Sequence, residues 1–199
     1  MPRISAPTVK EHRQVVLTAL VDSAERLLRD EGPAALTAGA VSADAGIARN
    51  SIYRYVDSVD DLRGMVLARY LPQWLDAVGS ALDAIDDPRE RILVWVTSTV
   101  EQAAVRGHSW LMDVARSMPD VNEVRQDVRA AHDHGAEFLA VEFQRMGLDA
   151  VATRTVMVRA LVDAAFGSVD NGEPLDAVVE LLRNSVSGLL EPTRVAAGR

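Results

Sequence analysis

The chain has 199 residues, of which 48% are hydrophobic and 25% are charged, and its formal net charge is −8 at pH 7. This composition is typical of a soluble globular protein with volume for one or two domains, and the lack of cysteine excludes disulfides and thiolate metal sites. No apolar run has the length of a signal peptide or of a membrane-spanning helix, so we expect a cytoplasmic protein.

The acidic charge is unevenly distributed along the chain. Residues 1–58 carry seven basic and seven acidic side chains, whereas residues 59–199 carry fourteen basic and twenty-two acidic ones. Binding to nucleic acid depends on the charge of the surface that meets it and not on the charge of the whole chain. The net charge therefore does not exclude DNA binding through residues 1–58.

The first predicted elements are a flexible arm over residues 1–11 and a helix over 12–30. The arm contains Lys10, which either lies in a DNA minor groove or makes no contact at all. Apolar residues keep helical spacing from 12 to 30, and Gly32 with Pro33 ends the helix.

A helix-turn-helix is predicted directly after this helix. Thr37 is a good N-cap for a short helix over 38–45, because its hydroxyl can accept a free amide of the first turn. Gly46 allows the left-handed backbone that ends such a helix. A second short helix over 48–56 then turns Ile52 inward and polar side chains outward, which is typical of a recognition helix.

The outward face of this second helix has the chemistry of a DNA-binding surface. Arg49 and Asn50 stand at its start, and these side chains pair with guanine and adenine in the major groove. Further polar side chains can hydrogen-bond phosphate oxygens, which fixes the register without reading the base sequence. These are Ser51, Tyr53, Arg54 and Tyr55. The alternative is that the two tyrosines only cover the sides of a small three-helix core.

The segment from Leu36 to Leu62 resembles the DNA-binding segment of the TetR family of bacterial repressors. The shared pattern is an L-T start, a short helix ending in A-G-[VI], a recognition helix with [LI]-Y-x-[HYF]-[FV], and a helix opening with an acidic residue and Leu. The matching residues are Leu36, Thr37, Val41, Ser42, Ala45, Gly46, Ile47, Ile52, Tyr53, Tyr55, Val56, Asp61 and Leu62.

The resemblance implies a homodimeric regulator with an effector pocket between its middle helices. It implies base contacts from Arg49, Asn50 and Ser51. It implies DNA-backbone contacts from Thr37, Tyr53 and Tyr55.

Two positions depart from the family pattern. The family usually places a lysine at the start of the helix after the recognition helix, where this chain has Val59 followed by Asp60 and Asp61. Gly39 stands where many relatives carry a longer polar side chain. Both changes remove DNA contacts.

The remainder of the chain is predicted to be helical throughout. Pro72 should kink or split the helix that starts near Val59, and we regard this helix as the element that transmits changes to the recognition helix. Further helices are expected over 88–106, 109–118, 121–146, 149–169 and 174–190. The prediction is an all-α protein of about nine helices in four parts: the arm 1–11, the helix-turn-helix domain 12–58, an effector-binding and dimerisation domain 59–192 and a flexible tail 193–199.

The last two helices are the predicted dimer interface. Both carry apolar stripes at helical spacing, and two such hairpins from two subunits can close a four-helix interface. The interface residues would be Val158, Leu161, Val162, Ala165, Val178, Leu182, Val186 and Leu189. The alternative is that both helices complete the core of a single chain.

Aromatic residues of the larger domain are candidates for an effector pocket, because helical domains hold small apolar molecules in aromatic cavities. The candidates are Trp74, Trp95, Thr99, Trp110, Met112, Phe138 and Phe166. The alternative for each of them is ordinary core packing.

Neither a metal site, a cofactor nor catalysis is expected. His132 and His134 face different directions on a helix, and the sequence contains no phosphate loop or nucleophile motif. The partners expected are an operator DNA duplex, a second copy of the chain and a small effector, without a membrane. The predicted function is a repressor that binds a palindromic operator as a dimer and is released by a small, largely apolar ligand. The alternative is a helical ligand-binding or protein-interaction dimer whose DNA-binding head is weakened or lost.

Overall fold

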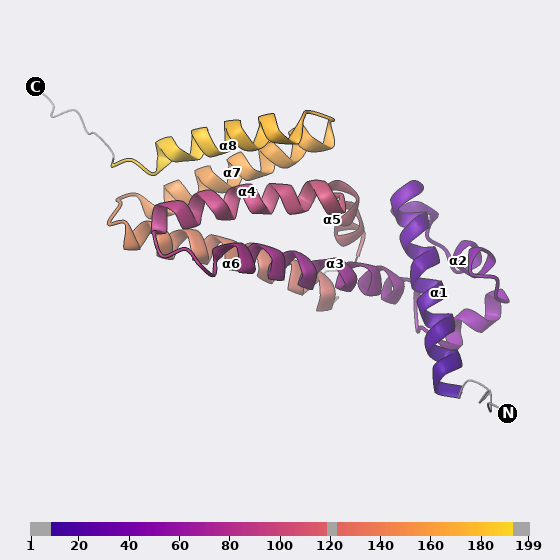
Figure 1. Ribbon diagram of the computed structural model, residues 1–199. Coiled ribbons are helices and arrows are strands. Elements are labelled where there is room, and N and C mark those ends of the chain that lie inside the picture. Colours follow the sequence, from indigo (N-terminus) through magenta and orange to yellow (C-terminus); the bar gives the residue numbers. More distant parts are fainter. Residues whose placement is uncertain (1–8, 119–122, 193–199) are drawn as a thin grey trace, which may run out of the picture. The chain divides into compact units, whose positions relative to one another are not determined.

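The computed structural model describes residues 9–118 and 123–192 and is shown in Figure 1. Within these ranges the chain forms eight α-helices and two short 3₁₀ helices, without a strand. The predicted all-α fold is confirmed. None of the helices in the described part of the chain combines the length and the apolar character that a bilayer crossing requires.

The contacts of the chain define two compact units. The N-terminal unit comprises the described parts of Met1–Arg69 and Trp110–Gln126, and the C-terminal unit comprises those of Tyr70–Ser109 and Asp127–Arg199. The boundary falls inside α3 (Val59–Leu82) and not at the 58/59 junction of the predicted domains. It does so because the first turns of α3 bury Leu62 and Val66 among the side chains of the N-terminal unit.

The N-terminal unit is a small helical core. Besides the start of α3 it contains α1 (Val9–Asp30), η1 (Pro33–Ala35), α2 (Ala38–Asp44), η2 (Arg49–Arg54) and most of α5 (His108–Ser117). Its fully buried apolar side chains include Leu20, Ala24, Val41, Ile52, Leu62, Val66 and Val114. They come from every α-helix of the unit and from η2, so the recognition segment is held by packing as well as by its own backbone.

Ion pairs join the helices of the N-terminal unit. Arg26 of α1 pairs with Asp44 at the end of α2, and hydrogen bonds from Ser23 and then Arg26 lower the pKa of Asp44. Arg69 of α3 contacts two carboxylates of α1, Asp22 at 2.7 Å and Glu25 at 3.0 Å. Burial opposes the charge of Arg69, but these two partners outweigh it and raise its pKa.

Three details of helices α1, η2 and α3 differ from the sequence prediction. Helix α1 begins at Val9, so the arm cannot extend to residue 11, and residues 1–8 lie outside the described part of the chain. The recognition segment is a six-residue 3₁₀ helix and not an α-helix over 48–56. Pro72 does not split α3, which continues through it, because the proline is exposed and water can solvate the carbonyl it leaves free.

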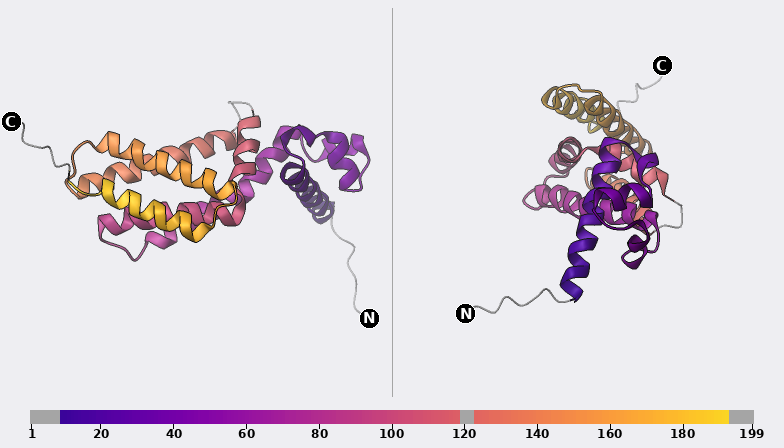
Figure 2. Two further views of the ribbon diagram at one scale, coloured as in Figure 1. Left: turned by 90° about the horizontal axis from the view of Figure 1, so that it is seen from above. Right: turned by 90° about the vertical axis from the view of Figure 1, so that its right-hand side faces the viewer.

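Three long helices pack on one another in the C-terminal unit. They are α4 (Pro88–Arg106), α7 (Val151–Asp170) and α8 (Leu175–Leu189), and Figure 2 shows α7 and α8 side by side as a hairpin. Helix α6 (Glu123–Arg145) adds Leu139 and Phe143 to the same core, both with no exposed surface.

The buried carboxylate of Glu142 and its arginine partners join the ends of these helices. Glu142, with 3% of its surface exposed, pairs with Arg91 at 2.7 Å and Arg145 at 2.6 Å. Arg91 also donates to the carbonyl oxygens of Leu82 and Ile85, both at 3.0 Å, which fixes the turn between α3 and α4. Charge-assisted bonds of this kind offset the cost of burying the carboxylate.

Candidate DNA-binding surface and ligand pocket

Local hydrogen bonds set the geometry of the helix-turn-helix. The hydroxyl oxygen of Thr37 accepts a 3.1 Å hydrogen bond from the amide of Ala40 and caps α2, as predicted. Gly46 has a φ of +70°, a left-handed conformation that side chains disfavour, and it turns the chain after α2. The amide of Ile47 then donates to the carbonyl of Ser42 at 2.9 Å, which closes the turn.

The recognition segment η2 has one buried and one exposed side. Ile52 has no exposed surface, whereas Arg49, Asn50, Tyr53 and Arg54 are exposed, Tyr53 with 58% of its surface. The six residues form a 3₁₀ helix because so short a segment makes few intrahelical bonds and is fixed mainly by the packing of Ile52. The polar face predicted from the sequence is therefore presented by a tighter and shorter helix.

The other two predicted contact residues of η2 are less exposed. Ser51 and Tyr55 are half-buried, and the guanidinium of Arg13 lies 5.7 Å from the centre of the Tyr55 ring. Tyr55 thus combines packing against α1 with its predicted role at the DNA backbone. The proposed DNA contacts of all seven residues remain predictions.

The basic side chains of the surface keep their charges available. In the described part of the chain, Arg49 and Arg54 take part in no ion pair. A methyl group added to Gly39 would lie 4.0 Å from Nε of Arg49, so α2 passes close beside this arginine. Arg49 can therefore reach a ligand without first breaking an internal bond.

The acidic residues at the start of α3 have internal roles. Asp61 accepts hydrogen bonds from the amides of Asp57 at 2.8 Å and Ser58 at 3.0 Å, and the Ser58 hydroxyl accepts one from the Asp61 amide. Burial opposes the charge of Asp61, but these bonds outweigh it and lower its pKa. Asp60 pairs with Arg63. The reciprocal hydrogen bonds of Ser58 and Asp61 form a capping box at the start of α3.

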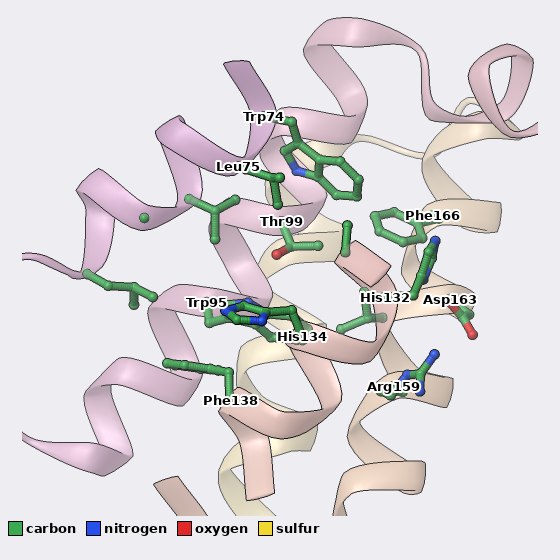
Figure 3. A pocket seen from close by; sticks show the side chains of 16 residues that line it. Trp74, Leu75, Trp95, Thr99, His132, His134, Phe138, Arg159, Asp163 and Phe166 are labelled. Carbon is green, nitrogen blue, oxygen red and sulfur yellow. The ribbon is translucent and has the colours of Figure 1, made fainter. Parts of the chain in front are cut away.

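The C-terminal unit contains a largely apolar cavity of about 280 Å³ that is partly open to solvent (Figure 3). Helices α3, α4, α6 and α7 form its walls. The lining residues are Trp74, Leu75, Val78, Gly79, Leu82, Trp95, Thr99, Ala131, His132, His134, Gly135, Phe138, Arg159, Val162, Asp163 and Phe166. A cavity of this size suits a ligand smaller than a typical drug molecule.

Aromatic pairs shape the cavity. The rings of Trp95 and Phe138 stack with centroids 5.8 Å apart, and the imidazole of His108 stacks on Phe166 at 3.9 Å. Trp95 approaches α6 where Gly135 leaves room, since a methyl group there would lie 2.8 Å from the indole carbon Cζ2. The glycine inside α6 thus positions an aromatic wall of the cavity.

Sequence reasoning identified part of this pocket. Five predicted effector residues line it, namely Trp74, Trp95, Thr99, Phe138 and Phe166. The other two, Trp110 and Met112, are corrected, because α5 returns the chain to the N-terminal unit after Ser109. There the guanidinium of Arg29 lies 5.0 Å from the Trp110 ring.

The charged residues of the pocket were missed. Arg159 and Asp163 are one helical turn apart on α7, and Phe166 follows on the same face. Two charged residues on a face that also carries Val162 and Phe166 are the signal that would have identified this wall. His132, which the sequence did not assign to a pocket, is half-buried and lines the same pocket.

The predicted dimer residues are largely core residues of the chain itself. Val158, Val162, Ala165, Leu182 and Val186 are buried, so they lack the free surface that an interface requires, and this part of the prediction is corrected. Leu161, Val178 and Leu189 are half-buried against the same core. The exposed apolar side chains of α7 and α8 are instead Val156, Met157 and Leu181, with 67%, 47% and 69% of their surface exposed.

Among the described residues, no cluster of three or more histidine, aspartate or glutamate side chains has an arrangement that could hold a metal ion.

The comparisons with known proteins address the helix-turn-helix first. Residues 20–63 match the model of the bacterial regulatory proteins of the tetR family. A helix-turn-helix-type transcriptional regulator of Mycobacterium tuberculosis is 31% identical over 81 residues. Residues 20–63 are therefore similar to the helix-turn-helix segment of the tetR-family regulators. The alignment covers 41% of this chain and only 40% of the length of that relative.

Solved structures extend the likeness to the whole TetR fold. A TetR-like transcriptional regulator from Rhodococcus sp. RHA1 matches 94% of this chain and 96% of its own, with a TM-score of 0.67 and 22% identity. The regulator AibR, solved in complex with isovaleryl coenzyme A and operator DNA, matches 89% of this chain and 98% of its own, with a TM-score of 0.64 and 15% identity. At sequence identities this low, the structural similarity establishes the fold alone.

Proposed function

We propose that this TetR-type chain is a transcriptional repressor that binds a palindromic operator as a homodimer. A small, largely apolar ligand in the C-terminal cavity would release it from the DNA. The observation that carries the proposal is the exposed polar face of η2, which is mounted on the buried Ile52 within the segment that matches the DNA-binding family.

The exposed face supplies both kinds of DNA contact. The guanidinium of Arg49 and the amide of Asn50 would read base edges in the major groove, assisted by Ser51. Arg54 and Tyr53 are exposed and would bind phosphates. Thr37 and Tyr55 would contact the same backbone, and the hydroxyl hydrogen of Thr37 remains available while its oxygen caps α2.

A palindromic operator requires two recognition segments related by a twofold axis. We infer that α7 and α8 pair with the same helices of a second copy through Val156, Met157 and Leu181, the exposed apolar side chains identified above. Exposed side chains of this size next to small ones such as Ala160 and Ala164 favour close helix packing between subunits.

Ligand release follows if the ligand prefers a conformation in which the two recognition segments no longer fit one duplex. Helix α3 contributes to both units, so a ligand that moves Trp74 or Val78 acts on the helix that also buries Leu62 beneath the helix-turn-helix. AibR, with its acyl-coenzyme A and operator DNA, supports such a pairing of two ligands on this fold.

Fluorescence anisotropy tests the DNA-binding part. The labelled probe is the DNA that flanks the gene encoding this chain, with unlabelled unrelated duplex as competitor. Replacing Arg49 or Tyr53 with alanine should weaken binding by about 1 to 3 kcal/mol each. The matched control is Arg116→Ala, since Arg116 is an exposed arginine of the same unit outside the helix-turn-helix. Equal affinity of Arg49→Ala and the parent would show that the assigned face is wrong.

Sedimentation velocity tests the dimer. Leu181→Glu places a charge on the proposed interface and should shift the protein to a monomer, because an unpaired charge buried between subunits is costly. Val141→Glu is the control, since Val141 of α6 is also exposed but lies outside α7 and α8. A dimer that survives Leu181→Glu and Val156→Glu would exclude this face.

The second candidate function is a helical ligand-binding or protein-interaction dimer with a lost DNA-binding head. Gly39 and Val59 favour it, because both positions lack a side chain that could bind phosphate. Asp60 and Asp61 argue less strongly for it, since both have internal partners that offset their charge. No specific DNA binding at low salt, combined with ligand binding, would select this candidate.

A further inference from the structure

The two sides of the C-terminal cavity differ in chemistry. Helices α3 and α4 provide apolar side chains and the hydroxyl of Thr99, whereas α6 and α7 provide His132, Arg159 and Asp163 (Figure 3). A ligand that fits both sides must have an apolar body and a polar or charged end. The question is the sign of that charge.

Arg159 is the decisive group. Its side chain is half-buried, and among the described residues it makes no ion pair, not even with Asp163 one turn away on α7. Other arginines of this unit are held by carboxylates, for example Arg91 by Glu142 and Arg183 by Glu90 at 2.9 Å. A half-buried guanidinium without a counter-charge gains more from a bound anion than a solvated one does.

The positive charge of Arg159 acts on His132 more strongly than either neighbouring carboxylate does. Burial, followed by the positive charge of Arg159, lowers the pKa of His132, while Asp163 and Asp133 act in the opposite direction with smaller effect. The field at the imidazole is therefore governed by Arg159 more than by Asp163. Asp163 is the more exposed of the two, so water screens its charge more.

The cavity offers a cationic ligand fewer favourable contacts than an anionic one. Cation binding by aromatic residues needs open ring faces. The Phe166 ring is already covered by His108 at 3.9 Å, and the Phe138 ring stacks with Trp95 and has the Arg91 guanidinium 5.5 Å from its centre. A cation near Asp163 would also meet Arg159.

We propose that the ligand of this cavity is a small organic anion, whose carboxylate or sulfonate pairs with Arg159 while its apolar body lies against Trp74, Trp95 and Val78. The regulatory meaning of this ligand rests on the proposed function, but its binding chemistry does not. His132 adjoins the same charge and would donate a second hydrogen bond to it. The volume of about 280 Å³ limits the body to roughly two rings or a short chain.

Two fluorescent probes with one skeleton test the proposal on the full-length chain. 5-Aminonaphthalene-1-sulfonate carries a sulfonate, and 1-naphthylamine is the same two-ring molecule without it. Arg159→Gln should weaken binding of the sulfonate by about tenfold or more, as expected for loss of a charge-assisted bond, and binding of the neutral amine by less than about twofold. Asp163→Asn, the matched control on the same wall, should leave sulfonate binding unchanged or tighten it.

The outcomes separate the alternatives. Competition between the two probes, with circular dichroism showing both variants folded, would establish one shared site. Equal loss of both probes in Arg159→Gln, or weaker sulfonate binding in Asp163→Asn, overturns the proposal, as does failure of both probes to bind the parent chain. Operator binding is measured separately. If it fails while the sulfonate discrimination holds, the proposed function falls and the anion site stands.

Discussion

Arginines in the two units fall into the same two groups. In the N-terminal unit, Arg26 and Arg69 hold helices together through carboxylates, whereas Arg49 and Arg54 make no ion pair within the described residues. In the C-terminal unit, Arg154 and other arginines are held by internal partners, whereas Arg159 faces a cavity and makes no ion pair among the described residues, even with Asp163 on the same wall. An arginine that forms ion pairs within its own unit stabilises the fold. An arginine without such a pair marks a candidate binding surface.

The glycines inside helices show a second contrast. A methyl group added to Gly39 would meet only Thr37 Oγ1 at 3.9 Å and Arg49 Nε at 4.0 Å, which are ordinary contact distances. A methyl group added to Gly135 would lie 2.8 Å from the Trp95 ring, which is too close. The N-terminal glycine is therefore dispensable for packing, while the C-terminal one is required by the shape of the cavity.

The contrast between arginines is tested most strongly at Arg154. This buried side chain donates to the carbonyl oxygens of Asp149 at 2.8 Å, Glu191 at 3.0 Å and Leu189, and it pairs with the Asp149 carboxylate. Arg154→Met should lower the free energy of unfolding by about 3 kcal/mol, because it removes three charge-assisted hydrogen bonds to main-chain carbonyls and one ion pair. Urea unfolding followed by circular dichroism measures the change.

Arg159→Met is the control for this measurement. It removes an arginine from the same helix but breaks no ion pair of the described residues, so its cost should stay within about 0.5 kcal/mol. Similar losses for the two variants would mean that internal pairing does not distinguish them.

The contrast between glycines is tested by Gly135→Ala. Overpacking against Trp95 should lower the free energy of unfolding by about 1 to 3 kcal/mol. The higher helix propensity of alanine should raise it by up to about 1 kcal/mol. A net loss of stability is therefore expected. Tryptophan fluorescence should report the displacement of the indole. Gly79→Ala is the matched control in α3, where a methyl group meets nothing within 4 Å, and it should not destabilise the protein.

Gly39→Ala should stabilise the protein, whereas Gly135→Ala should destabilise it. It should raise the free energy of unfolding by up to about 1 kcal/mol, because alanine restricts the unfolded chain and its methyl group fits beside Arg49. Thermal melting measures the gain, and operator affinity should stay within about twofold. A loss of stability would show that α2 needs the closer approach that glycine permits.

Local signals made the helix-turn-helix predictable. Thr37 caps α2 and Gly46 ends its turn through bonds within a few residues, so the sequence alone contains the information. The 3₁₀ geometry of η2 was not predictable in this way, because packing of Ile52 selects it.

The remaining errors concern contacts between distant residues. Helix α7 is apolar on more than one side, so spacing alone did not show that Val158 lies in the core while Val156 is exposed. Likewise, the position of Trp110 near other aromatic residues in the sequence gave no sign that α5 returns to the N-terminal unit. A stripe of apolar residues shows that a helix is buried, but not against which partner.

The smallest expected effect is a pH dependence at His132. Burial, then Arg159, lowers the pKa of His132 in the folded protein, against the pull of Asp163 and Asp133. The unfolded chain therefore binds a proton more readily, so the stability contributed by neutral His132 is complete above about pH 6.5 and is lost as the pH falls toward the lowered value. Unfolding of the parent and of His132→Gln between pH 7.5 and 5.5 measures the difference.

His132→Gln should lose less stability than the parent over this range, because glutamine cannot take up the proton. A bound anion at Arg159 reverses the sign for binding: its charge favours protonated His132, so the sulfonate probe should bind more tightly as the pH falls while the free protein becomes less stable. Parallel pH profiles of the parent and the variant would show that His132 does not titrate in this window. Weaker binding of the sulfonate probe at lower pH would instead show that the probe binds elsewhere in the C-terminal unit, away from Arg159 and His132.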